Sequence, residues 1–191
     1  MVYDKGLSTP YGVFSEIPNK KISDFKEVKK SIEMLTDKVC GKNKNIVDNP
    51  IVLDVHSSHC PNLTIIDLPG LTRIPIEGQD KNIHEVTTKM IRKYMEDPNT
   101  IILCVIPANQ DITNDEVLFM ARKIDTKGER TIGCITKIDI MDRGTDARSL
   151  LLNKDEVKLE LGFIGIKNRS QEDINENKTV NIIMIVGSKI N

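Results

Sequence analysis

Apolar residues recur along this chain with two different spacings. Apolar positions three and four residues apart predict helices over residues 25–39, 81–96 and 113–125, the last opened by a Thr113-Asn-Asp-Glu116 capping box. Short apolar runs next to Gly, Pro or Asn predict strands, which cover residues 51–56, 63–67, 101–106, 131–136 and 163–168. Strands that alternate with helices indicate an α/β protein with a mostly parallel sheet.

Two of these strands are expected to pair directly. Residues 51–56 alternate between apolar and polar side chains, as a half-exposed edge strand does, and a turn near Pro61 leads back to residues 63–67. We therefore expect an antiparallel pair. The run at residues 101–106 is apolar throughout, which is typical of a parallel strand covered on both faces.

The predicted strand at residues 63–67 ends in Asp67, and the sequence Asp67-Leu-Pro-Gly70 then interrupts it. Ligands of open α/β sheets lie outside the carboxyl ends of the strands. In nucleotide-hydrolysing proteins of this class, an Asp at such an end holds Mg2+, usually through a water. A following glycine lets a backbone N–H approach the terminal phosphate. The alternative is a strand that simply ends in a Pro-Gly turn.

A second strand end carries residues suited to recognising guanine. Residues 131–136 run into the sequence Thr136-Lys-Ile-Asp139. A carboxylate at Asp139 can accept hydrogen bonds from the ring N–H and the exocyclic amine of guanine. Adenine lacks that ring donor and would leave the charge unpaired, at a cost of about 1–3 kcal/mol or more. Lys137 can lie along the base. The tetrapeptide by itself is a weak signal, and its place at a strand end downstream of Gly70 strengthens it.

A third strand end follows residues 163–168 and continues into Asn168-Arg-Ser-Gln171. These side chains are suited to line the other side of a base. Because ligands gather where the carboxyl ends of strands meet, three such polar ends together predict a nucleotide site.

Four segments of the chain resemble the GTPase domain of dynamin-type large GTPases. They are LTIIDLPGLTRIP, VIPANQDI, RTIGCITKIDIMDRGTDAR and GFIGIKNRSQEDI, within a similarity that covers residues 11–174. The parts GTDAR and PANQD are not general GTPase features, so they favour dynamins over Ras-like or translation GTPases. The resemblance implies the Ras-like three-layer α/β fold of P-loop GTPases. It also implies binding and hydrolysis of GTP with Mg2+, coupled to self-assembly on membranes in fission or vesicle traffic.

The same resemblance assigns roles to individual residues. Asp67 and Gly70 match the metal-side and γ-phosphate-sensing positions, and Asp111 matches a residue that acts across the dimer of GTPase domains. A solvated loop residue at Asp111 and a helix cap at Asp142 remain alternatives. The positions that match the nucleotide-binding residues of the family are Thr136, Lys137, Asp139, Asp142, Asn168, Arg169 and Gln171.

The resemblance also implies partners and a location. GTP or GDP is the ligand, a second GTPase domain is the protein partner, and microtubule or cytoskeletal association is a further property of the family. Membranes are contacted through regions outside this chain, so the expected location is cytoplasmic and peripheral to membranes. Nucleic acid is not expected as a partner, because the net charge is −1 and the charges are interspersed.

The chain departs from the family pattern in one important respect. A GxxxxGKS phosphate-binding loop, whose backbone N–H groups hold the phosphates, does not occur in its 191 residues, and the family's Thr-bearing loop is not supplied by residues 1–10. We therefore expect residues 1–174 to be a partial GTPase domain and residues 175–191 a divergent tail. The expected function is that of a GTPase domain fragment, inactive in hydrolysis by itself. The alternative is a non-catalytic base pocket or a module for dimerisation or interference.

Composition agrees with one ordinary intracellular domain. The chain is 39% hydrophobic and has four cysteines without a CxxC pair. Cys104 and Cys134 lie in predicted strands and are expected to be buried small hydrophobes. A zinc site that uses Cys60 with His56 or His59 is the minor alternative, because a second cysteine pair is lacking. An apolar stretch of membrane-spanning length and a secretory signal are both absent from the sequence.

The tail contains one more predicted strand, residues 180–186, followed by Gly187-Ser188. In Ras-type sheets the phosphate-loop strand lies between the strands that correspond here to residues 63–67 and 101–106. Open edges there would leave N–H and C=O groups unpaired. We therefore predict that residues 182–186 fill this central place in parallel orientation. The alternative is a foreign or disordered end that pairs with nothing.

Overall fold

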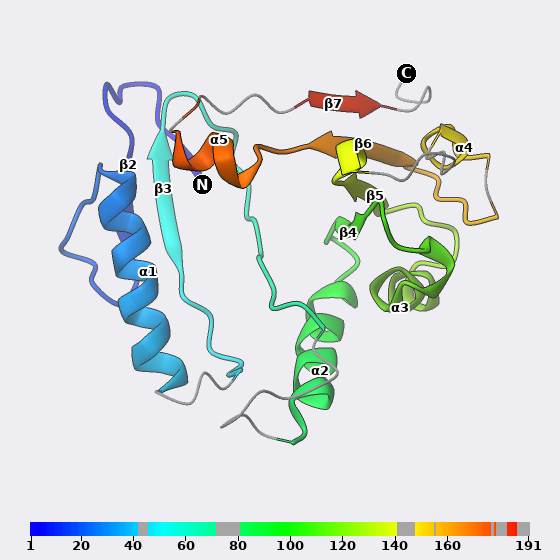
Figure 1. Ribbon diagram of the computed structural model, residues 1–191. Helices are drawn as coiled ribbons and strands as arrows, with labels where there is room; N and C mark the ends of the chain where they lie inside the picture. Colours follow the sequence, from blue (N-terminus) through cyan, green and yellow to red (C-terminus); the bar gives the residue numbers. More distant parts are fainter. Residues whose placement is uncertain are drawn as a thin grey trace. The chain divides into compact units, whose positions relative to one another are not determined.

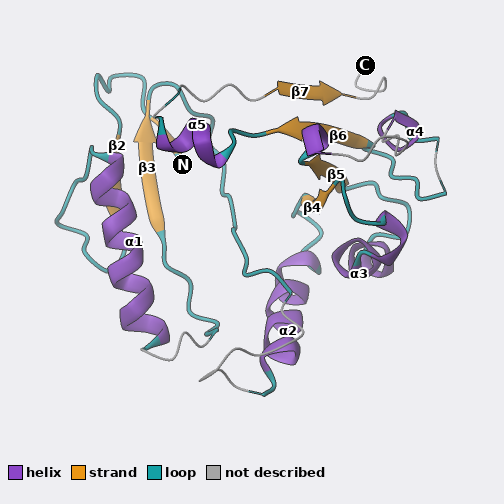
Figure 2. Ribbon diagram, viewed as in Figure 1, coloured by secondary structure: helices purple, strands orange, loops and turns teal. Residues whose placement is uncertain are grey.

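The computed structural model describes residues 1–41, 46–71, 81–140, 148–154, 156–176, 178 and 183–186. The chain divides into two compact units, Met1–Ile91 and Arg92–Asn191. The described part holds a three-stranded and a four-stranded sheet, together with helices that alternate with the strands (Figures 1 and 2). This mixed α/β composition, with three parallel strands in the second sheet, confirms the predicted fold class.

The sheet of the first unit has the order β1-β3-β2. Its strands are β1 (Val2–Tyr3), β2 (Tyr11–Phe14) and β3 (Leu53–Ser57). Strand β3 pairs in parallel with β1 and antiparallel with β2. Both edges of β3 are therefore occupied by strands from the amino-terminal part of the chain.

This arrangement overturns the predicted hairpin between residues 51–56 and 63–67. Residues 63–67 are not in a strand, and Leu63, Ile65 and Ile66 are exposed by 49%, 69% and 45%. The Met1 ammonium donates to the Leu63 carbonyl at 2.9 Å, so this segment begins beside the chain terminus. The physical reason is that β1 and β2 take the two edges of β3 and leave none for residues 63–67.

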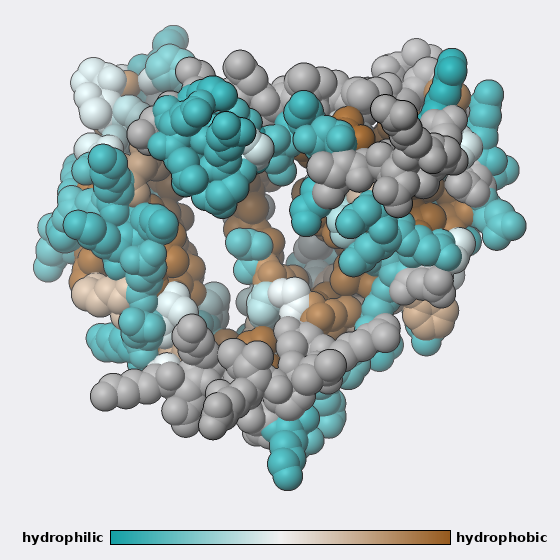
Figure 3. Space-filling model, viewed as in Figure 1, coloured by the Kyte–Doolittle hydropathy of each residue, from teal (hydrophilic) through white to brown (hydrophobic). Residues whose placement is uncertain are grey.

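Helix α1 (Phe25–Cys40) packs against the β2–β3 pair through a small core of Phe14, Ile22 and Leu35. The Asp24 carboxylate accepts from the Lys26 amide at 2.9 Å and caps its start. The helix was predicted correctly, and its first residue, Phe25, is 84% exposed. The side of α1 that faces the viewer in Figure 3 is mostly hydrophilic.

The unit boundary falls within helix α2 (Ile83–Met95), which confirms the helix predicted over residues 81–96. Its side chains are buried at spacings of three and four, which gives it one apolar face. Thr87 is fully buried there, and its hydroxyl donates to the Ile83 carbonyl at 2.7 Å. None of the helices in the described part of the chain combines the length and apolar character needed to cross a bilayer.

The sheet of the second unit has the order β4-β5-β6-β7. Strands β4 (Ile102–Pro107), β5 (Thr131–Thr136) and β6 (Phe163–Lys167) are parallel neighbours, which agrees with the predicted mostly parallel sheet. The expectation that β4 is covered on both faces is wrong, because Leu103 and Val105 on one of its faces are 53% and 56% exposed. Helix α3 (Glu116–Ile124) contacts β4, and α4 (Arg148–Leu151) contacts β6. Cys104 and Cys134 are buried as predicted, and burial raises the pKa of Cys104 to about 12.

The start of α3 differs from the predicted capping box. Thr113 lies in a separate 3-10 turn, η1 (Ile112–Asn114), and the helix begins after Asp115. The Asp115 carboxylate accepts from the Leu118 amide at 2.8 Å. Ser, Thr and Asp all cap helices, and here the Asp two residues later caps the helix in place of Thr113.

Strand β7 (Ile183–Val186) corrects the prediction for the tail. It pairs antiparallel with β6, from Ile164 with Val186 to Lys167 with Ile183. The proposed parallel insertion next to residues 63–67 or 101–106 is therefore wrong, and so is the alternative of an end that pairs with nothing. The free edge of β6 satisfies the same need for backbone partners and lies much closer along the chain. Residues 187–191 lie outside the described part.

Candidate functional site

Two parallel strand ends meet at one edge of the second sheet. Thr136, at the end of β5, stands opposite Ile166 of β6. The residues that follow these strands, Lys137–Asp139 and Asn168–Gln171, therefore leave the sheet at the same edge. Carboxyl ends of parallel strands are where open α/β sheets bind ligands. The structure thus brings together the two predicted base-binding segments.

Lys137 makes the turn out of β5. Its φ is +57°, in the left-handed region that only a few per cent of non-glycine residues adopt. Such a conformation costs about 1–2 kcal/mol per residue and recurs at functional sites. It leads directly into the 3-10 turn η2 (Ile138–Ile140), which carries Asp139.

Turn η2 is fixed against β6. A methyl group placed on Gly165 would lie 3.7 Å from Cδ1 of Ile138, so Ile138 reaches over the strand at that point. This contact lies directly before Asp139 in the chain, and the side chain of Asp139 is 37% exposed. The carboxylate is therefore positioned by the fold and still accessible to a ligand.

Asp139 has a neighbour that the sequence did not reveal. The Lys167 ammonium at the end of β6 lies 4.0 Å from Oδ2 of Asp139. The signal available in the sequence was a basic residue directly before Asn168, at the end of an otherwise apolar strand. Its contact with Asp139 depends on the β5–β6 register, which the sequence does not specify.

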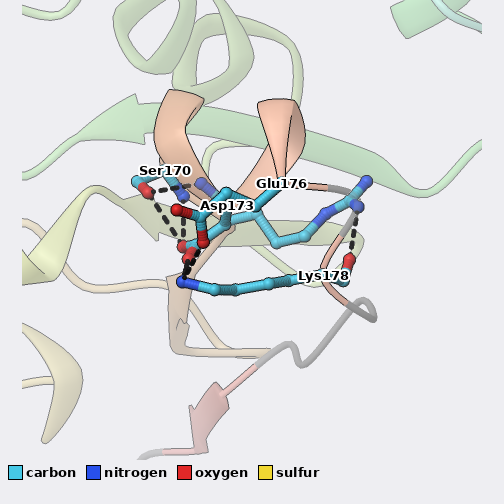
Figure 4. A network of polar contacts seen from close by, with 5 residues as sticks. Ser170, Asp173, Glu176 and Lys178 are labelled. Atoms are coloured by element: carbon cyan, nitrogen blue, oxygen red, sulfur yellow. Dashed lines mark hydrogen bonds and ion pairs between the residues drawn. The ribbon is translucent and has the colours of Figure 1, made fainter.

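The segment after β6 is held by its own hydrogen bonds. Helix α5 (Gln171–Asn175) begins with a capping box: the Ser170 hydroxyl accepts from the Asp173 amide at 3.1 Å, and the Asp173 carboxylate accepts from the Ser170 amide at 3.0 Å. The Lys178 ammonium lies 3.0 Å from Oδ1 of Asp173 and 2.9 Å from Glu176 (Figure 4). We call Arg169, Ser170, Asp173, Glu176 and Lys178 the α5 network.

Two predicted base-binding residues, Arg169 of the α5 network and Gln171 beside it, make hydrogen bonds within this segment. The Arg169 guanidinium donates to the Lys178 carbonyl at 2.8 Å, and the Gln171 amide donates to Asn175 at 3.1 Å. Hydrogen bonds from Lys178 and Ser170 lower the pKa of Asp173 to about 2. The segment after β6 is therefore held by charge-assisted hydrogen bonds.

The loop after β4 reaches the same edge of the sheet. The Ala108 amide donates to the Thr136 carbonyl at 2.8 Å, which places this loop beside the end of β5. Further along it, the Asp111 carboxylate accepts from the amide and the hydroxyl of Thr113, at 3.0 and 2.8 Å. Asp111 thus caps η1 while its residue remains exposed.

Asp67 and Gly70 belong to the first unit, and both are exposed in a segment without helix or strand. Space is open around Gly70, where an added methyl group would meet nothing within 4 Å. Asp142 lies outside the described residues. Within the described ranges, three His, Cys, Asp or Glu side chains do not gather as a metal site would require. A single carboxylate such as Asp67 suits Mg2+ only together with phosphate and water oxygens.

In the described part of the chain, the three side chains of the alternative zinc site, Cys60, His56 and His59, contact other groups. Cys60 Sγ lies 3.5 Å from the Val2 carbonyl and 3.6 Å from the Ser57 carbonyl. The His56 ring stacks on Tyr11, with centroids 4.8 Å apart, and His59 Nδ1 faces the Ser58 hydroxyl at 3.1 Å. These contacts lie within the first sheet and the turn that follows β3.

The second unit therefore has an α/β fold in which the polar ends of two parallel strands meet at one edge of the sheet. The family profile described as "Dynamin family" matches residues 5–138, and that described as "Dynamin central region" matches residues 146–183. The first match alone covers more than half of the chain. The chain belongs to the dynamin family of large GTPases.

Individual relatives agree with this assignment. The chain is 48% identical over 177 residues to "Dynamin-related protein DNM1" of Saccharomyces cerevisiae, covering 93% of this chain and 23% of that protein. It is 48% identical over 172 residues to "Dynamin" of Drosophila melanogaster, covering 90% and 20%. It is 43% identical over 180 residues to "Dynamin-A" of Dictyostelium discoideum, covering 94% and 21%. The chain thus spans about a fifth of the length of these relatives.

Proposed function

We propose that this chain carries the guanine-recognition part of a dynamin-type GTPase, with Asp139 as the residue that recognises the base. The observation that carries the proposal is the common sheet edge of β5 and β6, where Asp139 and residues 168–171 leave neighbouring strands. A carboxylate accepts from two donors of guanine, and adenine cannot supply both. The left-handed turn at Lys137 gives a local reason for the position of Asp139.

The other residues take roles around the base and the phosphates. Thr136 and Lys137 flank one side of the base, Asn168, Arg169 and Gln171 flank the other, and Asp142 follows the base motif. Gly70 approaches the γ-phosphate through its backbone N–H. Asp67 holds Mg2+ through a water, and the ion neutralises charge on the phosphates.

At the level of the whole protein, the proposed activity is GTP hydrolysis coupled to membrane fission or vesicle traffic. GTPase domains associate with one another through the surface that carries Asp111, and membranes are contacted by other regions. The support for this step is membership of the dynamin family, because the chain spans only a fifth of its relatives.

Guanine recognition can be tested without phosphate chemistry. Ligand-observed NMR with millimolar GMP should show saturation transfer from the chain, and AMP should show none. Asp139→Asn should lose GMP and gain XMP, since xanthine carries a carbonyl where guanine has its amine. Asp54→Asn, an exposed position on β3, is the matched control. Equal transfer to GMP and AMP in the unaltered chain would overturn the proposal.

One sequence observation supports a narrower function for these 191 residues taken alone. They contain no GxxxxGKS segment, and phosphoryl transfer depends on positioning and electrostatic stabilisation of the phosphates. We therefore propose that the chain by itself is a base pocket or interaction module without turnover. Phosphate release from GTP at high protein and Mg2+ concentrations measures this, and turnover above the buffer rate contradicts it.

A further inference from the structure

Lys167 places a cation beside the proposed guanine-recognising carboxylate. Its Nζ lies 4.0 Å from Oδ2 of Asp139, and the two side chains are 48% and 37% exposed. Neither side chain is buried, so the pair can open at small cost when a ligand arrives. Lys167 is not among the residues assigned above to base recognition.

The position of Lys167 follows from the alternation of β6. Side chains two residues apart point to the same face of a strand, so Lys167 shares a face with Gly165 and Phe163. Gly165 is also where Ile138 of η2 reaches over the strand. Because η2 lies against β6 at Gly165, Asp139 comes within reach of Lys167.

The chemistry of the pair opposes that of base recognition. Guanine uses both oxygens of a carboxylate, through its ring N–H and its exocyclic amine. An ammonium group near one oxygen draws negative charge away from those hydrogen bonds, and the ion pair must loosen before both oxygens are free. The same ammonium lowers the penalty for a base that lacks the amine, because the oxygen left without a partner keeps its cation.

We propose that Lys167 sets the strength and selectivity of guanine binding by competing with the base for Asp139. This inference rests on the proposed function, since it requires Asp139 to bind the base. Lys167 thereby weakens guanine binding and reduces discrimination against hypoxanthine. It is a specificity-determining residue and takes no part in phosphate chemistry.

The experiment compares GMP and IMP binding by the full 191-residue chain, by ligand-observed NMR titration at 50 and 300 mM NaCl. Lys167→Met should bind GMP about two- to fivefold more tightly at low salt, the range expected for an exposed ion pair. Salt screens the pair in the unaltered chain, so the gain should shrink at 300 mM. The ratio of GMP to IMP affinity should also rise.

Two further variants keep the result interpretable. Lys167→Gln removes the charge but keeps a polar side chain at the strand end, so it serves if Lys167→Met folds poorly. Lys89→Met removes the ammonium from an exposed helical pair with Glu85, at 2.8 Å, and should change neither ligand.

The outcomes separate the two proposals. If the unaltered chain binds GMP and the Lys167 variants bind it equally or more weakly, the inference about Lys167 fails and guanine recognition stands. If neither the chain nor its Lys167 variants bind GMP, the proposed function fails and this inference falls with it.

Discussion

The Thr131 hydroxyl donates a 2.6 Å hydrogen bond to Oδ2 of Asp125, and both residues are buried. The same carboxylate accepts from the amides of Glu129 and Arg130, each at 3.0 Å. Asp125 thus joins the end of α3 to the start of β5, at the opposite end of β5 from Asp139. The role of this carboxylate is structural: it stabilises the turn that leads from α3 into β5.

Removal of this carboxylate should destabilise the second unit. Asp125→Ala leaves the Thr131 hydroxyl and two amides without their acceptor in a buried place, at about 1–3 kcal/mol for each group left unpaired. Thr131→Val removes one donor only and should cost less. Urea denaturation followed by circular dichroism measures both. A smaller loss for Asp125→Ala than for Thr131→Val would contradict the assignment.

The same site predicts a loss of stability in acid. Burial by itself would raise the pKa of Asp125, but hydrogen bonds from Thr131 and from the amides of Arg130 and Glu129, with the Arg130 charge, lower it below its usual value. Because the folded-state pKa is depressed, the contribution is full above the unfolded value of about 3.9 and is lost as pH falls through the lower folded-state value. Asp125→Asn should flatten this acid limb in unfolding measured between pH 5 and pH 2. An unchanged limb would mean that other carboxylates cause it.

Gly133 is required by the ring of Phe163. A methyl group built on Gly133 would lie 2.1 Å from Cδ1 of Phe163, and this ring is only 2% exposed. Gly133→Ala should therefore destabilise the fold by about 1–3 kcal/mol through overpacking. Gly165→Ala is the matched control on the adjacent strand, since its added methyl would meet Leu151 at an ordinary 3.4 Å. Thermal unfolding midpoints decide, and equal midpoints for the two variants would contradict the packing argument.

The α5 network should be visible in the titration of Asp173. The Lys178 ammonium is the first cause of its low pKa, about 2, and the Ser170 amide and hydroxyl come next. Lys178→Met should move the Asp173 titration, followed by carboxyl 13C NMR, up toward the ordinary value of about 3.9. Lys89→Met should leave it in place. Because the pKa of Asp173 is lowered, its ion pair with Lys178 is intact above about pH 4 and is lost as the pH falls toward 2. An unmoved titration in Lys178→Met would remove Lys178 from the network.

Features that depend on local chemistry alone could be predicted from the sequence. Helix α2, the parallel strands β4, β5 and β6, and the burial of Cys104 follow from apolar spacing, and all were predicted. The pairing of strands is different, because the composition of a strand does not show which other strand it will pair with. Residues 63–67 have strand composition, yet β1 and β2 occupy both edges of β3.

The candidate site divides in the same way. The segments that contain Asp139 and Arg169 were identified from their places after predicted strands. The contact between Lys167 and Asp139 was not, because it depends on the β5–β6 register and on the packing of η2 against β6. The left-handed turn at Lys137 also escaped prediction, since lysine has no preference for that conformation.

Asp111 offers a test that separates a cap from an interface residue. Its carboxylate caps η1, and asparagine caps about as well as aspartate. Asp111→Asn should therefore keep the thermal stability of the chain, whereas Asp111→Ala should lower it by about 0.5–2 kcal/mol. If Asp111 acts across a dimer of GTPase domains through its charge, both variants should reduce self-association in sedimentation velocity. Self-association that survives in Asp111→Asn and falls only in Asp111→Ala would assign Asp111 to the cap alone.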